Sequence, residues 1–220
     1  MKISAMVLGE DKDYLKYCLE SIKGIVDEIV MSDLRIDDFA EMRNDCLKRI
    51  TGDWVLVLDS DEILANPDGS NVSRRQLEKL IEQAEKEGIT GYHIFTLHFL
   101  YNYRMIDGSN NGQHYSYGRL YKREHIERYK GKIHELPVFK YGQNLKPTSE
   151  FFIWHFGHCK GMEYVREKYR RTMKIPGNPF KPEFERFKDT DEYCKSHPFF
   201  MMTKPVIFYY GPLPEVLKLW

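Results

Sequence analysis

The chain has 220 residues, which suits one domain or one domain with an appended tail. Lysine plus arginine number 33, as do aspartate plus glutamate, so the net charge is zero and a large basic surface for nucleic acid is not expected. Hydrophobic residues make up 42% and charged residues 30%, a balance typical of a globular, soluble protein.

The cysteines and the apolar runs indicate the compartment. None of the 4 cysteines forms a CxxC pair, and Cys18 and Cys46 fall on apolar helix faces, so buried thiols in a reducing cytoplasm are expected. The N-terminal MKISAMVLGEDKD has too short an apolar run for a signal peptide, and no run of about 18 apolar residues predicts a transmembrane helix. We therefore expect a cytoplasmic protein.

Strand and helix patterns alternate through the first half of the chain. Apolar runs predict strands at 3–8, 25–31, 54–58 and 91–99. Apolar residues at helical spacing predict helices covering 15–22, 39–50 and 77–84. Asp37 or Asp38 is expected to cap the second helix, and Ser73 opens the third with a capping-box sequence.

This alternation predicts an α/β fold. Strands joined through helices imply right-handed crossovers and a mainly parallel sheet with helices on both faces. Ligands of such sheets bind at the carboxyl ends of the strands. Asp59, Ser60 and Asp61 directly follow the third predicted strand, so they are expected at that edge.

The second half of the chain has a different character. Residues 101–118 are rich in Gly, Asn and Tyr and are predicted to form a loop or lid, whose aromatic rings can stack on sugars and bases. Shorter strands are predicted at 119–122, 132–139 and 150–156, and a basic amphipathic helix is predicted by the spacing of Met162, Val165, Tyr169 and Met173. Residues 176–220 are expected to form a helical and aromatic tail. We interpret it as an appendage packed on the domain; a peripheral membrane contact and a homodimer contact are the alternatives.

The acidic motif Asp59-Ser60-Asp61 predicts a metal site. Mg²⁺ and Mn²⁺ prefer oxygen ligands, often one or two carboxylates together with substrate phosphates. In extended backbone, residues i and i+2 point to the same side, so Asp59 and Asp61 can share one ion. One alternative is a charged loop that caps the next helix. Another is the aspartyl-phosphate motif of phosphatases, although that motif usually follows the first strand, with Thr or Val after it.

Residues 38–64, DFAEMRNDCLKRITGDWVLVLDSDEIL, resemble the family 2 glycosyltransferases of the GT-A fold, a Rossmann-like nucleotide-diphospho-sugar transferase fold. Residues 17–33 are also similar to the first helix and second strand of that family. The resemblance covers about residues 1–175, leaving 176–220 as the appendage. It implies inverting transfer of a hexose-type sugar from a UDP- or GDP-linked donor to the hydroxyl of a glycan, lipid or protein acceptor. The D-x-D pair would hold Mn²⁺ or Mg²⁺ on the donor diphosphate.

The resemblance also implies roles for three residues outside the D-x-D motif. Arg43, of the Arg-Asn helix, would contact the donor or pin the acidic loop, and an exposed helix arginine is the alternative. Glu135, in GKIHELP, would be the general base, and pairing with a nearby basic residue is the alternative. His155, in FFIWHFGH, would be a further metal ligand, with His158 as its substitute, and ordinary core or turn histidines are the alternative.

The chain departs from the family pattern in two places. Ser32-Asp33 runs almost directly into Arg35, so a nucleotide-facing loop and one strand are missing. After the first strand, only Glu10 matches the usual Lys-Asn-Glu. Asp33 and Glu10 are nucleotide-contact candidates, with solvated loop acids as the alternative. The lost loop also supports a second hypothesis, a catalytically degenerate domain that acts as a binding or scaffolding module.

Overall fold

The computed structural model describes residues 1–9, 11–34, 38–100, 102–108, 114–160, 164, 167, 171, 174–175 and 206–218. The strands are β1 Ile3–Leu8, β2 Glu28–Met31, β3 Trp54–Asp59, β4 Glu62–Ala65, β5 Gly91–Leu100, β6 Met105–Asp107, β7 Tyr115–Lys122, β8 Ile126–Lys130, β9 Leu136–Phe139, β10 Leu145–His158 and β11 Val206–Phe208. The α-helices are α1 Leu15–Ile22, α2 Phe39–Arg49 and α3 Arg74–Glu87. Short 3₁₀ helices occupy Arg123–His125 and Glu215–Lys218.

The core of the fold is a mixed sheet in the order β11-β6-β5-β7-β3-β1-β2, with β10 pairing both β5 and β4. β1 pairs in parallel with β2 and β3, and β10 pairs in parallel with β5. β7 runs antiparallel between β3 and β5, so these two strands point the same way. β2, β1, β3, β5 and β10 therefore share one direction. The predicted α/β class with a mainly parallel sheet flanked by helices is confirmed.

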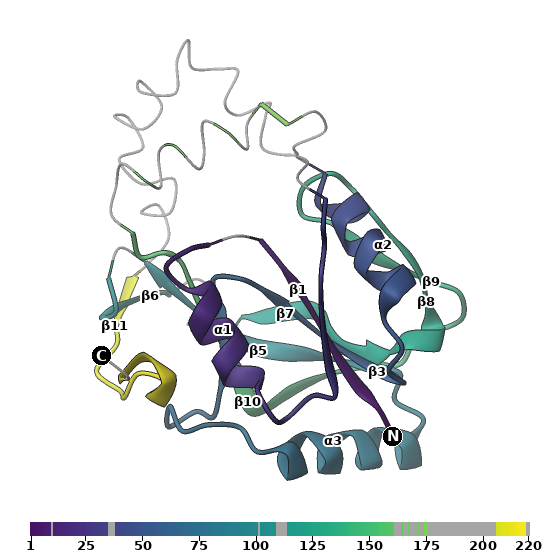
Figure 1. The fold of residues 1–220 in the computed structure, drawn as a ribbon. Helices are drawn as coiled ribbons and strands as arrows, with labels where there is room; N and C mark the ends of the chain where they lie inside the picture. The colour runs from purple at the N-terminus through teal and green to yellow at the C-terminus, as the bar shows by residue number, and fades with distance from the viewer. Residues whose placement is uncertain are drawn as a thin grey trace.

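Helices cover both faces of the sheet (Figure 1). α1 and α3 pack their apolar residues on one face, in a core that includes Cys18, Ile22, Leu77 and Ile81. α2 and the separate hairpin β8–β9 cover the other face, where Cys46 lies in the same cluster as Tyr129. Cys18 and Cys46 are both buried free thiols, as predicted.

The helix boundaries follow the predicted caps. The Asp38 carboxylate accepts the Glu41 backbone N–H at 3.0 Å, which satisfies one free donor of the first turn of α2. Ser73 and Gln76 form a complete capping box at the start of α3. Gly88 ends α3 in the left-handed conformation, with φ of 66°, which glycine adopts without steric cost.

The observed strands correct several predictions. Residues 101–118 include β6 and the start of β7, so they are not only a loop. The predicted strand 132–139 is a strand only from Leu136, because His134 has a φ of 53°, outside the extended region. β10 begins at Leu145 rather than at residue 150, and β2 begins at Glu28 rather than at residue 25. β4 and β8 were not predicted, because each is short and follows a turn closely.

Much of the predicted C-terminal region lies outside the described residues, including most of the helix expected from Met162 to Met173 and residues 176–205. Within the described part of the tail, β11 pairs antiparallel with β6. The Glu215 N–H donates to the Gly69 carbonyl at 2.8 Å, and Val216 is buried against the core. Residues 206–218 therefore contact the domain. No helix in the described ranges is both long and apolar enough to cross a membrane.

Candidate active site

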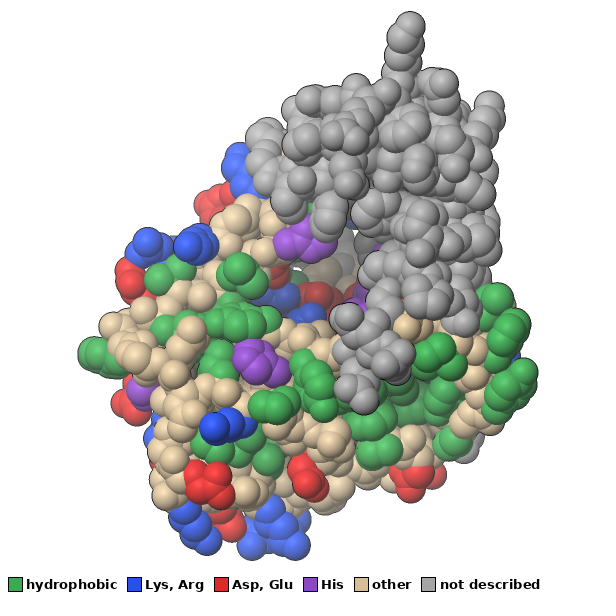
Figure 2. All heavy atoms as spheres, turned by 180° about the vertical axis from the view of Figure 1, so that it is seen from behind, with side chains coloured by type: hydrophobic (Ala, Val, Ile, Leu, Met, Phe, Trp, Pro, Cys, Tyr) green, Lys and Arg blue, Asp and Glu red, His purple; other side chains and the backbone are tan. Residues whose placement is uncertain are grey.

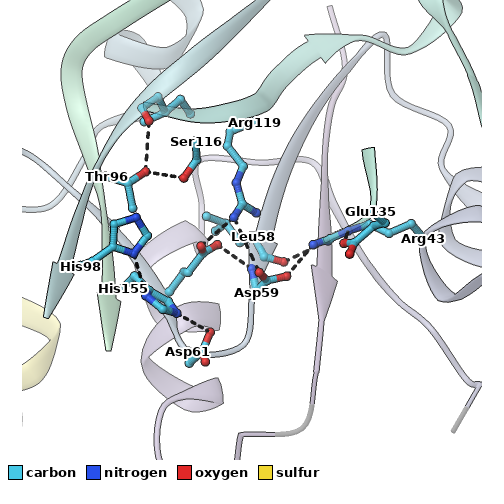
Figure 3. Close-up of polar contacts among 12 residues, drawn as sticks. Arg43, Leu58, Asp59, Asp61, Thr96, His98, Ser116, Arg119, Glu135 and His155 are labelled. Atoms are coloured by element: carbon cyan, nitrogen blue, oxygen red, sulfur yellow. Dashed lines mark hydrogen bonds and ion pairs between the residues drawn. The ribbon is translucent and has the colours of Figure 1, made fainter. Parts of the chain in front are cut away.

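The acidic motif lies at the carboxyl end of β3, beside the end of β1. Asp59 is the last residue of β3, and Ser60 and Asp61 form a turn into β4. The Ser60 N–H donates to the Leu8 carbonyl at 2.6 Å, and its hydroxyl accepts the Asp11 N–H at 3.0 Å. The backbone is therefore not extended through the motif, and the prediction that it would be is wrong. The turn directs Asp59 and Asp61 to different partners (Figure 3).

Arg43 connects the acidic motif to Glu135. Its guanidinium donates to Asp59 Oδ1 at 2.5 Å, to Glu135 Oε1 at 2.9 Å and to the Leu58 carbonyl at 3.4 Å. The side chain is only 3% exposed. Burial acts to lower the pKa of Arg43, but the carboxylates of Asp59 and Glu135 outweigh it and the pKa is raised. Arg43 is therefore a permanent buried cation, and the exposed helix arginine that was the alternative is excluded.

Asn44, the next residue, fixes the hairpin that carries Glu135. Its amide donates to the Tyr129 carbonyl at 3.1 Å and accepts the Tyr129 N–H at 2.7 Å. The Phe39 N–H, at the start of α2, donates to the Lys132 carbonyl at 2.9 Å. The Arg-Asn pair thus has a structural explanation, because Arg43 bridges two carboxylates while Asn44 ties β8 to α2.

A second buried ion pair supports the other side of Asp59. Arg119, on β7, donates to Glu62 Oε1 at 2.8 Å and lies 3.6 Å from Asp59 Oδ2. Glu62 is 2% exposed, and its Oε2 accepts the Asp59 N–H at 2.8 Å. Burial raises the pKa of Glu62 to about 7, and Arg119 only partly opposes this. Burial also acts to raise the pKa of Asp59, but Arg43 and Arg119 outweigh it and the pKa is lowered.

Asp61 faces the histidines instead of the arginines. Its Oδ1 lies 3.7 Å from His155 Nε2, and both side chains are 13% exposed. His155 Nδ1 lies 3.0 Å from His98 Nδ1, and the His158 ring stands edge-on to His155 at 5.2 Å. Burial lowers the pKa of His98 well below its ordinary value. A Cβ added to Gly157 would overlap Asp61 Oδ2 and lie 2.8 Å from His155 Nε2, so the absence of a side chain at Gly157 lets both groups pack against the backbone there.

The cluster carries more negative than positive groups. Its two guanidinium groups face four carboxyl groups: Arg43 and Arg119 against Asp59, Asp61, Glu62 and Glu135. Both guanidinium groups bind at or near Asp59, and none of the ion pairs described above joins either of them to Asp61. In the space-filling view, acidic, basic and histidine side chains meet in a hollow of the molecular surface (Figure 2). Such an excess favours binding of a cation or of protons.

The cation-binding capacity of this hollow is limited. In the part of the chain that the structure describes, no three His, Cys, Asp or Glu side chains are grouped to hold a metal ion. Asp61 and His155 bring one carboxylate and one imidazole close together, and both pack against the backbone of Gly157. These two donors fit a divalent ion such as Mn²⁺ that takes its remaining ligands from a bound diphosphate and water.

The remaining predicted residues are placed less centrally. Asp33 is largely exposed and pairs with Arg49 at 3.1 Å, not with the arginines of the cluster. Glu10 lies outside the described residues. The sequence assigned no role to the side chains of Asn44, His98 or Arg119, because their partners are distant in sequence. The Arg-Asn pair was the local signal for Asn44.

Comparisons with known proteins give weak likenesses. No protein-family model matches the chain. A TPR repeat-containing protein of Synechococcus elongatus is 32% identical over 80 residues, covering 27% of this chain and 20% of that protein. A solved structure of S. aureus TarS matches 79% of this chain and 39% of its own, at 10% identity and a TM-score of 0.45. S. aureus TarS 1-349 in complex with UDP-GlcNAc matches 79% and 64%, at 11% identity and the same TM-score of 0.45. The chain thus spans about a fifth of the curated relative, and these likenesses carry no conclusion about its activity.

Proposed function

We propose that the chain is a metal-dependent inverting glycosyltransferase that moves a sugar from a nucleotide-sugar to an acceptor hydroxyl. The observation that carries the proposal is the pairing of Asp61 with His155, packed against Gly157 at the carboxyl edge of the sheet. Ligands of α/β sheets bind at this edge. The resemblance of residues 38–64 to family 2 glycosyltransferases assigns the diphosphate of a nucleotide-sugar to the same place.

On the donor side, the Asp61 carboxylate and His155 Nε2 would hold Mn²⁺ or Mg²⁺. When bound, the ion would stabilise the negative charge that develops on the departing nucleoside diphosphate. Asp59 would act beside it, since its two oxygens face Arg43 and Arg119 and its carboxylate is still 39% exposed. The two arginines fix the orientation of Asp59, which leaves its exposed edge to contact the donor directly or through water.

On the acceptor side, Glu135 would remove the proton from the attacking hydroxyl. Arg43 holds Glu135 Oε1 at 2.9 Å and Asp59 Oδ1 at 2.5 Å, so one rigid side chain sets the position of the base relative to the donor site. Asn44 adds a second constraint by tying the same hairpin to α2. The acceptor oxygen would attack the anomeric carbon opposite the diphosphate, and its proton would move to the Glu135 carboxylate, with inversion.

Calorimetry with UDP- and GDP-sugars, with and without Mn²⁺, tests the proposal. We expect Mn²⁺-dependent binding by the wild-type chain, and its loss in Asp61→Asn with the melting temperature preserved. Asp45→Asn, on α2 and bonded to Ser32 and Arg49 rather than to the cluster, is the matched control. Mn²⁺-dependent donor binding that survives in Asp61→Asn would remove the metal assignment.

Turnover separates the proposal from its alternatives. Glu135→Gln should lower sugar transfer by about 10²- to 10⁴-fold, with donor binding intact, because the proton acceptor is lost while the Gln Oε1 can still accept the Arg43 hydrogen bond. Donor binding without any transfer by the wild type, over a panel of glycan, lipid and protein acceptors, would indicate a binding module. Hydrolysis of a phosphomonoester, with capture of beryllofluoride at Asp59, would instead indicate a phosphatase.

A further inference from the structure

The hairpin β8–β9, which lies beside α2 at the side of the molecule (Figure 1), has an inner and an outer face. Tyr129 on β8 is opposite Pro137 on β9, and Tyr129 is buried in the same cluster as Cys46. The neighbouring opposed pair, Lys130 and Leu136, points the other way, because side chains alternate along each strand. Lys130 is exposed, and Leu136 is 49% exposed. The outer face of the hairpin therefore places a cation beside an exposed apolar side chain.

Three further cations lie on or next to this outer face. Arg128 is opposite Val138, so this pair lies on the same side as the first one. Lys140 is exposed and follows Phe139, which packs against the core. Lys132 is exposed in the loop that joins the two strands. We call this set the basic face: Arg128, Lys130, Lys132, Leu136, Val138 and Lys140.

The cations of the basic face outnumber the carboxylates beside them. Residues 126–141 contain two acidic side chains. Glu127 pairs with Arg128, and Glu135, which is only 12% exposed, pairs with Arg43. In the ranges that the structure describes, none of the three lysines of the basic face has an ion pair. Because the whole chain has a net charge of zero, this positive surface is a local feature.

We propose that the basic face docks on an anionic lipid bilayer, with its three lysines among the headgroups and Leu136 inserted between them. Lysine side chains near an anionic bilayer are attracted to its surface, and an apolar side chain gains free energy when it leaves water for the headgroup boundary. Glu135 precedes Leu136 in the chain but points inward to Arg43. Docking would thus hold the hairpin of the proposed base at the membrane while its carboxylate faces the site.

The size and chemistry of the basic face favour a bilayer over other anionic partners. A stable protein interface takes about 20–30 residues from each partner, far more than the basic face supplies. Nucleic acid binds lysines through its phosphates and would leave Leu136 in water. A bilayer offers anionic headgroups and an apolar layer beneath them, so it matches both the lysines and Leu136.

Sedimentation with phosphatidylcholine vesicles, with and without phosphatidylserine, tests the docking. We expect the wild type to bind only the vesicles that contain phosphatidylserine, and to bind them less as salt is added. Each lysine near the surface should strengthen binding about fivefold, so Lys130→Gln, Lys132→Gln and Lys140→Gln combined should weaken it about 100-fold.

A matched control removes three exposed lysines from the opposite side of the sheet. Lys23, Lys79 and Lys86 lie on or directly after the helices α1 and α3, which cover the other face. Their combined replacement by Gln changes the net charge equally and should leave vesicle binding as in the wild type. Equal weakening in the two triple variants, or anionic-vesicle binding that survives in both, would overturn the proposal. So would a wild type that does not bind these vesicles.

Leu136→Ser separates a bilayer from a soluble polyanion. We expect it to weaken vesicle binding about 5- to 10-fold, because less apolar surface is buried, while binding to polyphosphate stays as in the wild type. Unchanged vesicle binding by Leu136→Ser would mean that the face recognises negative charge alone, and would overturn the bilayer as its partner. Melting temperatures check that every variant is folded. None of these measurements uses Mn²⁺ or a nucleotide-sugar, so their outcome is independent of the proposed function.

Discussion

The two ends of β1 and β3 both carry charged side chains, but they are built in different ways. At the amino end, Glu28 accepts hydrogen bonds from the Ser4 hydroxyl at 2.5 Å, the Thr51 N–H at 2.6 Å and the Thr51 hydroxyl at 2.7 Å. It also accepts from the Gly52 N–H at 3.2 Å and pairs with Lys2 at 3.0 Å. One carboxylate is thus matched by several donors of the chain itself.

At the carboxyl end, the donors are fewer than the acceptors. Arg43 serves both Asp59 and Glu135, and Arg119 serves both Glu62 and Asp59. Asp61 Oδ1 lies 3.7 Å from His155 Nε2, on the side of the cluster that carries the histidines. At the amino end, donors of the chain itself thus match the Glu28 carboxylate, and these contacts stabilise the sheet. Among the described residues, the ion pairs at the carboxyl end join two guanidinium groups to three carboxyl groups, a balance that would suit the proposed cation and diphosphate.

Substitution of Arg43 should have the largest effect on stability. Arg43→Met keeps most of the buried volume but leaves Asp59 and Glu135 without their shared cation, so we expect a loss of about 3–5 kcal/mol in the free energy of unfolding. Arg49→Met is the matched control on the same helix, where a 40% exposed arginine should contribute less than about 1 kcal/mol. Urea denaturation measures both. Equal losses of stability in the two variants would contradict the role of Arg43 as the shared cation of Asp59 and Glu135.

At the amino end, protonation of Glu28 in acid should lower the stability of the fold. Burial acts to raise the pKa of Glu28, but hydrogen bonds from Ser4, Thr51 and Lys2 outweigh it and lower the pKa to about 2. A lowered pKa stabilises the fold above the unfolded-state value of about 4.3 and loses that stabilisation as the pH falls toward 2. The contribution of Glu28 is about 3 kcal/mol by this linkage.

Denaturation of the wild type and Glu28→Gln at several pH values checks this prediction. The wild type should be the more stable at pH 7, and the difference between the two proteins should shrink as the pH is lowered from about 4.5 to 2. Donor binding at pH 7 should be unchanged, because the substitution lies at the opposite end of the strands. A difference in stability that is the same at pH 7 and pH 3 would contradict the assigned role of Glu28.

Substitution of Asn44 should have the smallest of these effects on stability. It should also lower the catalytic rate. Asn44→Ala leaves the Tyr129 N–H and carbonyl without their amide partner, at a cost of about 1–3 kcal/mol. Because the hairpin that carries Glu135 is then less firmly held, kcat should fall while donor affinity stays the same. Steady-state kinetics and donor calorimetry measure the two quantities. An unchanged kcat would show that Arg43 alone positions the base.

The local parts of the fold were predictable from the sequence because their causes are local. The Asp38 cap, the Ser73 capping box and the apolar run into Asp59 each depend on residues within one or two turns of the chain. The corrections arose where backbone conformation breaks the pattern. His134 adopts a positive φ, and Ser60-Asp61 forms a turn, so alternation along an extended strand does not describe either segment.

The site was predictable only in part, because its contacts are long-range. Arg43 and Glu135 are 92 residues apart, and His98 and His155 are 57 apart. The second pair forms because of the register between β5 and β10, which no local pattern specifies. The motif indicated which carboxylates matter, but the tertiary structure decides that Asp59 faces arginines and Asp61 faces histidines.

Anomalous diffraction from a crystal grown with Mn²⁺ and UDP tests most directly whether the carboxyl end requires a cation. Data collected near the manganese edge locate the ion without reference to activity. We predict one anomalous peak within bonding distance of both the Asp61 carboxylate and His155 Nε2, with the diphosphate completing the coordination. Bound UDP with no peak at this position, or a peak that touches neither residue, would contradict the account.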